Sequence, residues 1–351
     1  MRVSVLSRYA LISCVAAAML AGCGVLRQAQ DDTRQAQDDT RQAQDHTRQA
    51  QDDTRPVTGA SVGPSSAIVR KDQSLLYVSD PQAGDVYMIA VPSGRLVGKL
   101  TGFSSPNGDC VDQHENVFVD DSGEGQVRAY AHGARSAFRV LNDASWYPNT
   151  CSVDPTTGNL AVCNIRTTQA EGTIAVYLNA KGAAHYHKYS GASNFWYCAY
   201  DGDGNLFADA ISYGEGPGSN IFLELPKGQG KLRPLSLRPS ITGDSSSPLF
   251  WDGKHLAIAS TSSGAIYQYK ISSNIGTRVA VVRLDDTSAV LGPFWITSNG
   301  SAQTLYAAIA VDSIESVGVY RYPAGGKRIQ HLYDAPLPFA AAVSTALSPS
   351  H

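Results

Sequence analysis

Residues 148–164 have the sequence PNTCSVDPTTGNLAVCN, and this stretch decides the fold. It has the pattern of a β-strand, a tight polar turn that contains Gly158-Asn159, and a second β-strand. Variants recur as PNGDCVDQHENVFV at residues 106–119 and as YCAYDGDGNLFA at residues 197–208. A unit that repeats on this scale cannot bury its own apolar face, so its copies must pack on one another.

A third strand pattern follows each of these pairs and sets the spacing of the repeats. Successive copies lie about 40–50 residues apart, the length of one four-stranded propeller blade. The copies are Val86–Ile89, Val127–Tyr130, Ile174–Tyr177, Ile221–Glu224, Ile266–Tyr269 and Val319–Tyr322. We therefore predict that residues 63–348 are all-β and form a six-bladed β-propeller of four-stranded antiparallel blades.

The segment LPFAAAVS, residues 337–344, resembles the first strand of yet another repeat. It falls where a strand that closes the ring should lie, beside the N-terminal blade. It either replaces or accompanies the strand pattern at residues 66–69. Closing the ring removes exposed sheet edges.

Two turn motifs carry a family resemblance. Asp154-x-x-x-Gly158-Asn159-Leu160 and Asp201-x-x-Gly204-Asn205-Leu206 resemble the repeats of NHL-type six-bladed β-propellers. The region is also similar to uncharacterised secreted bacterial propeller lipoproteins. The resemblance implies the fold and assigns no activity.

The first 22 residues have the pattern of a bacterial signal peptide. Arg2 and Arg8 flank a short apolar run that ends in small residues. The ending Leu20-Ala21-Gly22-Cys23 resembles a lipobox, which implies cleavage before Cys23 and attachment of lipid to its sulfur. Gly24 after that cysteine indicates the outer membrane. The alternative is a plain secretory signal followed by a chance cysteine.

Residues 23–62 hold the lipidated cysteine and a polar linker. The heptad Arg-Gln-Ala-Gln-Asp-Asp-Thr occurs four times from Arg27, with His46 as one replacement. One alanine per heptad cannot build the two-position seam of a coiled coil. We expect a solvated tether that holds the propeller away from a membrane; a helix that binds a partner is the alternative.

Charge and composition exclude one class of partner. The 351 residues have a formal net charge of −3, whereas nucleic-acid binding needs a concentrated basic face. The chain is 43% hydrophobic, so it can bury a large core. We expect a monomer.

Aromatic residues gather at the predicted first strands, near one mouth of the ring. There they can stack on a sugar, a peptide or a partner's side chain, or they can pack between blades. The candidate ligand-binding residues are Trp146, Tyr147, Phe195, Trp196, Tyr197, Phe250, Trp251, Phe294 and Trp295.

Three asparagines, Asn107, Asn149 and Asn194, occupy similar positions at the entry of these strands. In gluconolactonase-like six-bladed propellers, asparagines and acidic residues at the channel hold a divalent metal. The resemblance makes these residues candidate ligands for Ca²⁺, whose preferred ligands are oxygens. No counterpart of that family's catalytic aspartate is evident, and an asparagine before a strand is commonly a turn former.

Four cysteines remain in the predicted propeller, Cys110, Cys151, Cys163 and Cys198. In the simplest hairpin register Cys151 lies opposite Cys163, which allows a disulfide between them. Cys151 and Cys198 also share a position on neighbouring first strands. Four cysteines allow three full pairings, and buried free thiols are a further alternative.

These features predict a propeller, lipid-anchored in the bacterial cell envelope, that binds a ligand, a protein or a glycan through one face of its ring. We expect a binding module without a cofactor rather than an enzyme. The alternative is a metal-dependent lactonase or similar hydrolase at the mouth of the channel. Fold alone does not decide between them, because propellers host many unrelated functions.

Overall fold

In the computed structural model the chain divides into two units, residues 1–66 and residues 67–351, and the described residues all belong to the second. The predicted signal peptide, Cys23 and the heptad linker lie outside the described residues. Within the described part, no helix has the length and apolar character needed to cross a bilayer. The described residues are 72–143, 147–165, 171–212, 219–244, 246–285, 289–299, 301–311, 314–332 and 340–344.

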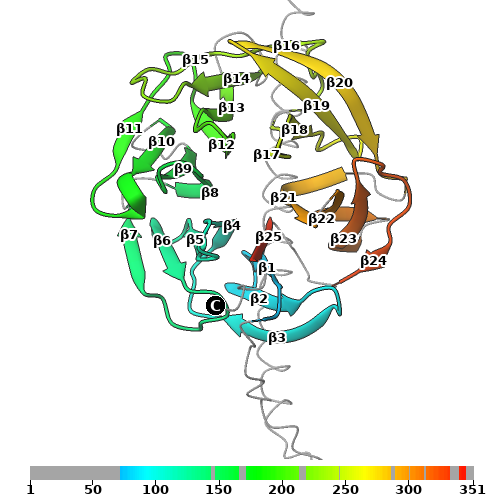
Figure 1. The fold of residues 1–351 in the computed structure, drawn as a ribbon. Coiled ribbons are helices and arrows are strands. Elements are labelled where there is room, and N and C mark those ends of the chain that lie inside the picture. The colour runs from blue at the N-terminus through cyan, green and yellow to red at the C-terminus, as the bar shows by residue number, and fades with distance from the viewer. Residues whose placement is uncertain are drawn as a thin grey trace, which may run out of the picture. The chain divides into compact units, whose positions relative to one another are not determined.

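Six β-sheets stand around a common axis, each with one strand nearest that axis (Figure 1). We number these sheets as blades 1 to 6 in chain order. Blade 2 consists of β4 (Pro106–Val111), β5 (Val117–Asp121), β6 (Gln126–Tyr130) and β7 (Arg139–Asn142). Blade 3 consists of β8 (Tyr147–Val153), β9 (Leu160–Ile165), β10 (Thr173–Tyr177) and β11 (His185–His187), with the short 3₁₀ helix η1 (Leu178–Ala180) between its last two strands.

The next three blades follow the same plan, with one addition. Blade 4 contains β12 (Asn194–Tyr200), β13 (Leu206–Ser212), β14 (Ser219–Leu225) and β15 (Arg233–Pro234). Blade 5 contains β17 (Leu249–Trp251), β18 (Leu256–Ala259), β19 (Ala265–Ser272) and β20 (Ile275–Arg283), and β16 (Ser236–Arg238) adds to its outer edge in parallel with β20. Blade 6 contains β21 (Ala289–Asn299), β22 (Ala302–Val311), β23 (Ile314–Tyr322) and β24 (Gln330–His331).

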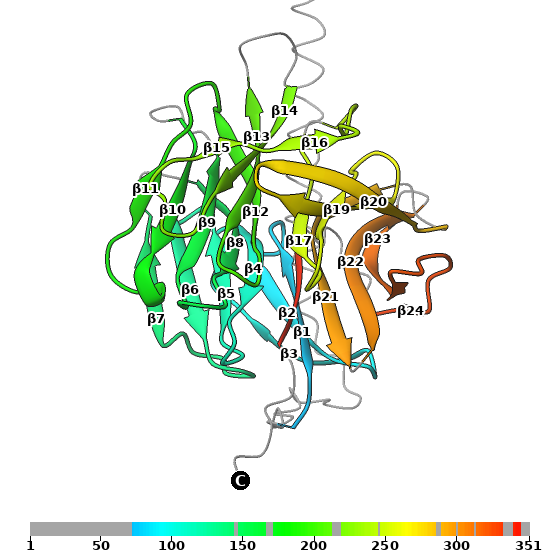
Figure 2. The ribbon, with the colours of Figure 1, turned by 45° about the horizontal axis from the view of Figure 1, so that its top comes forward.

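Blade 1 is built from both ends of the propeller. Its outer three strands are β1 (Leu75–Asp80), β2 (Asp85–Ala90) and β3 (Arg95–Leu100), and its inner strand is β25 (Ala340–Ser344). Strand β25 pairs antiparallel with β1, with Leu76 opposite Val343. Figure 2 shows β25 beside β1 at the centre of the ring. The predicted ring-closing strand is therefore present, in the first place of the blade.

These sheets confirm the predicted six-bladed propeller. The six repeated segments fall on β2, β6, β10, β14, β19 and β23, each of which is the third strand from the axis of its blade. The sequence spacing placed them correctly because every blade has the same order of strands from the axis outward.

Within the described residues the core consists of six apolar clusters, each shared by two neighbouring blades. Alternation along β1 illustrates how the sheets achieve this, because successive side chains point to opposite faces. Leu75 and Tyr77 belong to the cluster between blades 1 and 2. Leu76 and Val78 belong to the cluster between blades 6 and 1, which closes the ring. Every blade is thus buried on both faces.

Hydrogen bonds between an aspartate and an asparagine four residues later close the recurring turn between the first two strands of a blade. The Oδ1 atom of Asp201 accepts the backbone N–H of Asn205 at 2.8 Å, and the Asn205 amide donates back to Oδ2 at 2.8 Å. Asp112 and Asn116 make the same pair of bonds at 2.8 Å. Both segments are therefore blade turns that close through their own side chains.

Candidate ligand-binding site at the centre of the ring

A cavity of about 340 Å³ lies at the centre of the ring. Its walls come from the inner strands of blades 2 to 6 and from the turns that follow them. Five of the nine predicted aromatic residues line it: Tyr197, Phe250, Trp251, Phe294 and Trp295. The structure thus brings together aromatic residues from three blades that are far apart in the sequence.

The ring of Phe250 contacts two of the others. The ring of Phe250 lies 5.9 Å from that of Phe294, and 5.1 Å from that of Trp295 in an edge-on arrangement. Trp295 also packs against the cluster between blades 2 and 3 and against the cluster between blades 6 and 1. Because those clusters lie on different sides of the ring, the Trp295 indole reaches across its axis.

Three of the other predicted aromatic residues lie elsewhere. Phe195 is fully buried in the cluster between blades 3 and 4. Trp196 packs against the cluster between blades 4 and 5, and its indole N–H has no acceptor among the described residues. Tyr147 is 45% exposed at the start of β8 and does not line the cavity. Trp146 lies outside the described residues.

A carboxyl group that sequence reasoning did not single out also lines the cavity. Asp109 is buried, and the Ser79 hydroxyl donates a hydrogen bond of 2.6 Å to its Oδ1 atom, whereas Oδ2 has no partner among the described residues. Burial raises the pKa of Asp109 to about 7, against a smaller lowering by the bond from Ser79. The sequence offered one signal for Asp109 as a cavity residue: it follows Asn107 by two positions on a predicted inner strand.

Four of the inner strands, β4, β8, β12 and β21, contain an irregularity, a β-bulge, in their pairing with the next strand. In β12 the bulge lies between Phe195 and Tyr197, and the freed backbone N–H of Tyr197 donates to the Asp209 carboxylate at 2.8 Å. Asp209 also accepts the N–H of Ser247 from blade 5 at 2.8 Å. The buried Asp209 side chain thus accepts the N–H that the bulge leaves unpaired, and it also links blade 4 to blade 5.

Asp120 lies beside the corresponding bulge of β4. A Cβ atom at Gly108 would lie 2.6 Å from its Oδ2 atom and 2.5 Å from the main-chain oxygen of Asn149, so only glycine fits there. Neither carboxylate oxygen of Asp120 has a hydrogen-bond partner among the described residues. Burial raises the pKa of Asp120, and nearby Asp109 raises it further.

Two of the three predicted metal ligands come together. The Asn107 amide donates to Ser122 Oγ at 2.7 Å and to Asn149 Oδ1 at 3.4 Å. The Asn149 amide donates to the Trp196 carbonyl at 2.8 Å, while Asn194 lies on the same strand as Trp196, opposite Ile211. The described residues contain no group of three or more His, Cys, Asp or Glu side chains able to hold a metal ion. Asn107 and Asn149 link neighbouring inner strands here, and the metal site stays a prediction.

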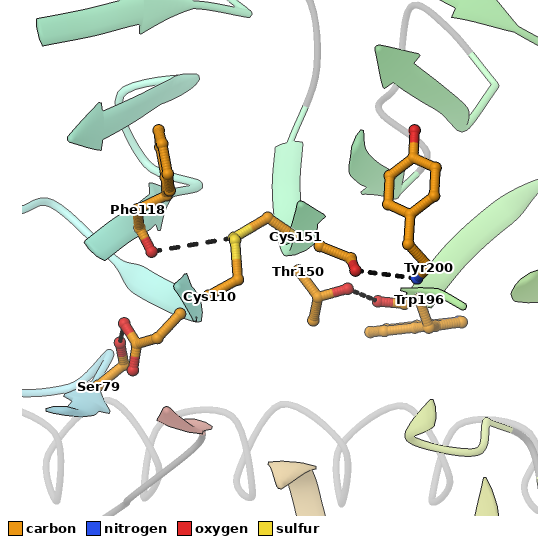
Figure 3. The surroundings of a disulfide bond; sticks show 9 residues. Ser79, Cys110, Phe118, Thr150, Cys151, Trp196 and Tyr200 are labelled. Carbon is orange, nitrogen blue, oxygen red and sulfur yellow. Dashed lines mark hydrogen bonds between the residues drawn. A yellow bond between two sulfur atoms is a disulfide. The ribbon is translucent and has the colours of Figure 1, made fainter. Parts of the chain in front are cut away.

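The predicted disulfide between Cys151 and Cys163 is replaced by one between Cys110 and Cys151, which joins β4 to β8 (Figure 3). The bulge between Pro148 and Thr150 shifts the register by one residue, so Cys151 lies opposite Val162 and Cys163 lies opposite Thr150. Neighbouring positions on a strand face opposite sides. Cys151 therefore faces blade 2, whereas Cys163 faces blade 4.

Comparisons with known proteins support the fold alone. No protein-family model matches the chain, and no curated protein is similar to it. A protein of unknown function from Bacteroides caccae is similar in structure, with a TM-score of 0.57 and 14% identity over 78% of this chain and 99% of its own. A chain of a nidogen/laminin complex has a TM-score of 0.59 and 11% identity over 78% of this chain and 100% of its own.

Proposed function

We propose that this propeller is a binding module whose ligand inserts a ring-sized group into the central cavity. The observation that carries the proposal is the aromatic wall formed by Phe250, Trp251, Phe294 and Trp295 around about 340 Å³. That volume lies in the range of small-ligand sites, which combine aromatic walls with few polar groups. Asp109 and Thr150 supply polar groups at the same cavity. Two kinds of ligand can stack on such an aromatic wall: the sugar ring of a glycan and an aromatic side chain of a protein.

Fluorescence titration tests this proposal, because Trp251 and Trp295 both line the cavity. The purified protein would be titrated with a panel of oligosaccharides and, separately, of peptides that contain aromatic residues. We expect one panel to quench the fluorescence and raise the melting temperature. In Trp251→Ala the affinity for that ligand should fall about 30-fold, which corresponds to about 2 kcal/mol.

Tyr147→Ala is the matched control, since Tyr147 is exposed and lies away from the cavity. It should bind as the wild type does. An equal loss of affinity in both variants would contradict a binding site at the cavity. So would a fluorescence signal that neither panel changes.

We further propose that the protein is an NHL-type propeller lipoprotein, anchored in the bacterial envelope at the outer membrane. The support is the segment Leu20-Ala21-Gly22-Cys23, the polar linker that follows it, and the Asp-Gly-Asn turns of the blades. A lipid chain holds a protein at a membrane without a spanning helix. Cys23→Ser should abolish incorporation of labelled fatty acid and move the protein out of the membrane fraction. Retention of the label in this variant would refute the anchor.

A metal-dependent hydrolase is the second candidate. It is favoured by the contact between Asn107 and Asn149 and by the nearby Asp120 carboxyl group, whose oxygens have no hydrogen-bond partner within the described part of the chain. Elemental measurement of the purified protein, with melting temperature before and after a chelator, tests it. A stoichiometric divalent ion whose removal lowers the melting temperature would support this candidate, and the absence of both effects would eliminate it.

A further inference from the structure

The two cysteines outside the disulfide form a pair of their own. Cys163 on β9 and Cys198 on β12 are both buried and both unbonded in the structure. They belong to the same apolar cluster, the one shared by blades 3 and 4. The two thiols lie close enough to influence each other, since Cys198 adds to the burial that raises the pKa of the Cys163 thiol.

This proximity follows from the bulge in β8. The register shift that turns Cys151 toward blade 2 leaves Cys163 on the opposite face of the sheet, toward blade 4. On blade 4, Cys198 pairs with Ala208 of β13 and belongs to the same interblade cluster as Cys163. The arrangement therefore repeats one step around the ring: Cys110 with Cys151 between blades 2 and 3, then Cys163 with Cys198 between blades 3 and 4.

The two thiols differ in access. Cys198 lines the central cavity, as do Cys110 and Cys151, whereas Cys163 is fully buried behind it. A small reagent that enters the cavity therefore meets Cys198 first.

We propose that Cys163 and Cys198 are a redox site that forms a second interblade disulfide when the protein meets a small disulfide such as oxidised glutathione. The Cys198 thiol loses its proton and its sulfur attacks the reagent, which forms a mixed disulfide and releases one thiolate. The Cys163 thiol then loses its proton and attacks the Cys198 sulfur, which forms the Cys163–Cys198 bond and releases the second thiolate. Two protein thiols are oxidised and one disulfide is reduced to two thiols, so atoms and electrons balance.

Two consequences follow. First, the second step is the slow one near neutral pH, because burial raises the pKa of the Cys163 thiol and the thiolate is the attacking species. Second, the two bonds together join blades 2, 3 and 4 into one covalent unit next to the cavity. Neither consequence depends on the identity of the cavity's ligand.

Peptide mapping tests the proposal on the wild-type protein after treatment with oxidised glutathione and blocking of free thiols. Trypsin alone does not separate Cys151 from Cys163, since no lysine or arginine lies between them. An added cleavage before aspartate cuts at Asp154 and isolates Cys163 on residues 154–166 and Cys198 on residues 189–200. We expect these two fragments to be joined without reductant and separate with it.

The variant Cys110→Ser/Cys151→Ser provides an independent measurement, because within the propeller it retains only the proposed pair. Thiol titration of the denatured propeller should then fall by two per molecule after oxidation, and Cys198→Ser should abolish the joined fragments in the wild-type background. If the double variant does not fold, the wild-type map decides alone. Three results of the peptide map would each overturn the proposal. They are complete blocking of both thiols, a glutathione that stays attached to Cys198, and a disulfide between Cys198 and Cys151.

Discussion

Replacing Asp109 by asparagine should remove a pH-dependent loss of stability. Burial raises the pKa of Asp109 from 3.8 to about 7, so the folded state binds this proton more tightly than the unfolded state does. The free energy of unfolding therefore falls as the pH rises from about 4, and the loss is complete above about pH 7. A rise of about three units corresponds to a loss of about 4 kcal/mol. Asparagine keeps the oxygen that accepts the Ser79 hydroxyl and carries no charge.

Urea unfolding at pH 4 and at pH 8 measures the effect. The stability of Asp109→Asn relative to the wild type should increase by about 4 kcal/mol between these two pH values. Asp203→Asn is the control, because Asp203 is exposed in a blade turn, and its difference from the wild type should change little. A difference for Asp109→Asn that is the same at both pH values would refute the reasoning that burial controls this carboxyl group.

Three further substitutions test the packing of the ring. Cys110→Ala/Cys151→Ala opens a cross-link between residues 41 apart and should lower the free energy of unfolding by about 4 kcal/mol in guanidinium titration; an unchanged midpoint would show that the bond adds no stability. Gly108→Ala places a Cβ atom 2.5 Å from a main-chain oxygen and should cost about 3 kcal/mol, seen as a lower melting temperature, whereas a wild-type melting curve would contradict the close approach. Tyr322→Phe removes a 2.9 Å hydrogen bond to buried Asp252 and should cost about 2 kcal/mol in urea; no loss would mean that the bond is not formed in solution.

The blade repeat could be predicted because its signals are local. Asp201 and Asn205 close their turn with hydrogen bonds that depend only on residues four apart, and the same bonds recur at Asp112 and Asn116. Turn chemistry of this kind fixes the spacing of strands before any tertiary contact forms. The extra strand β16 has no such signal, because it pairs with β20 through residues nearly forty positions away.

The disulfide could not be predicted, because one inserted residue reverses which side of a strand a side chain faces. The bulge between Pro148 and Thr150 reverses the side on which Cys151 lies relative to Cys163. The aromatic residues pose the same difficulty. Phe195 and Trp196 are neighbours in sequence, yet they pack into clusters on opposite faces of blade 4. Adjacent aromatic residues thus indicate a strand near the axis without indicating which ring lines the cavity.

The position of β25 has a consequence for how the protein is made. In chain order it follows every other described strand, yet it supplies the inner strand of the blade that β1 begins. During synthesis or export the inner edge of β1, residues 75–79, therefore waits with its backbone unpaired until residues 340–344 arrive. An unpaired apolar edge is a template for intermolecular pairing. Chains interrupted before residue 340 should aggregate or be degraded while full-length chains accumulate, so completion of the polypeptide acts as a quality-control step for the whole ring.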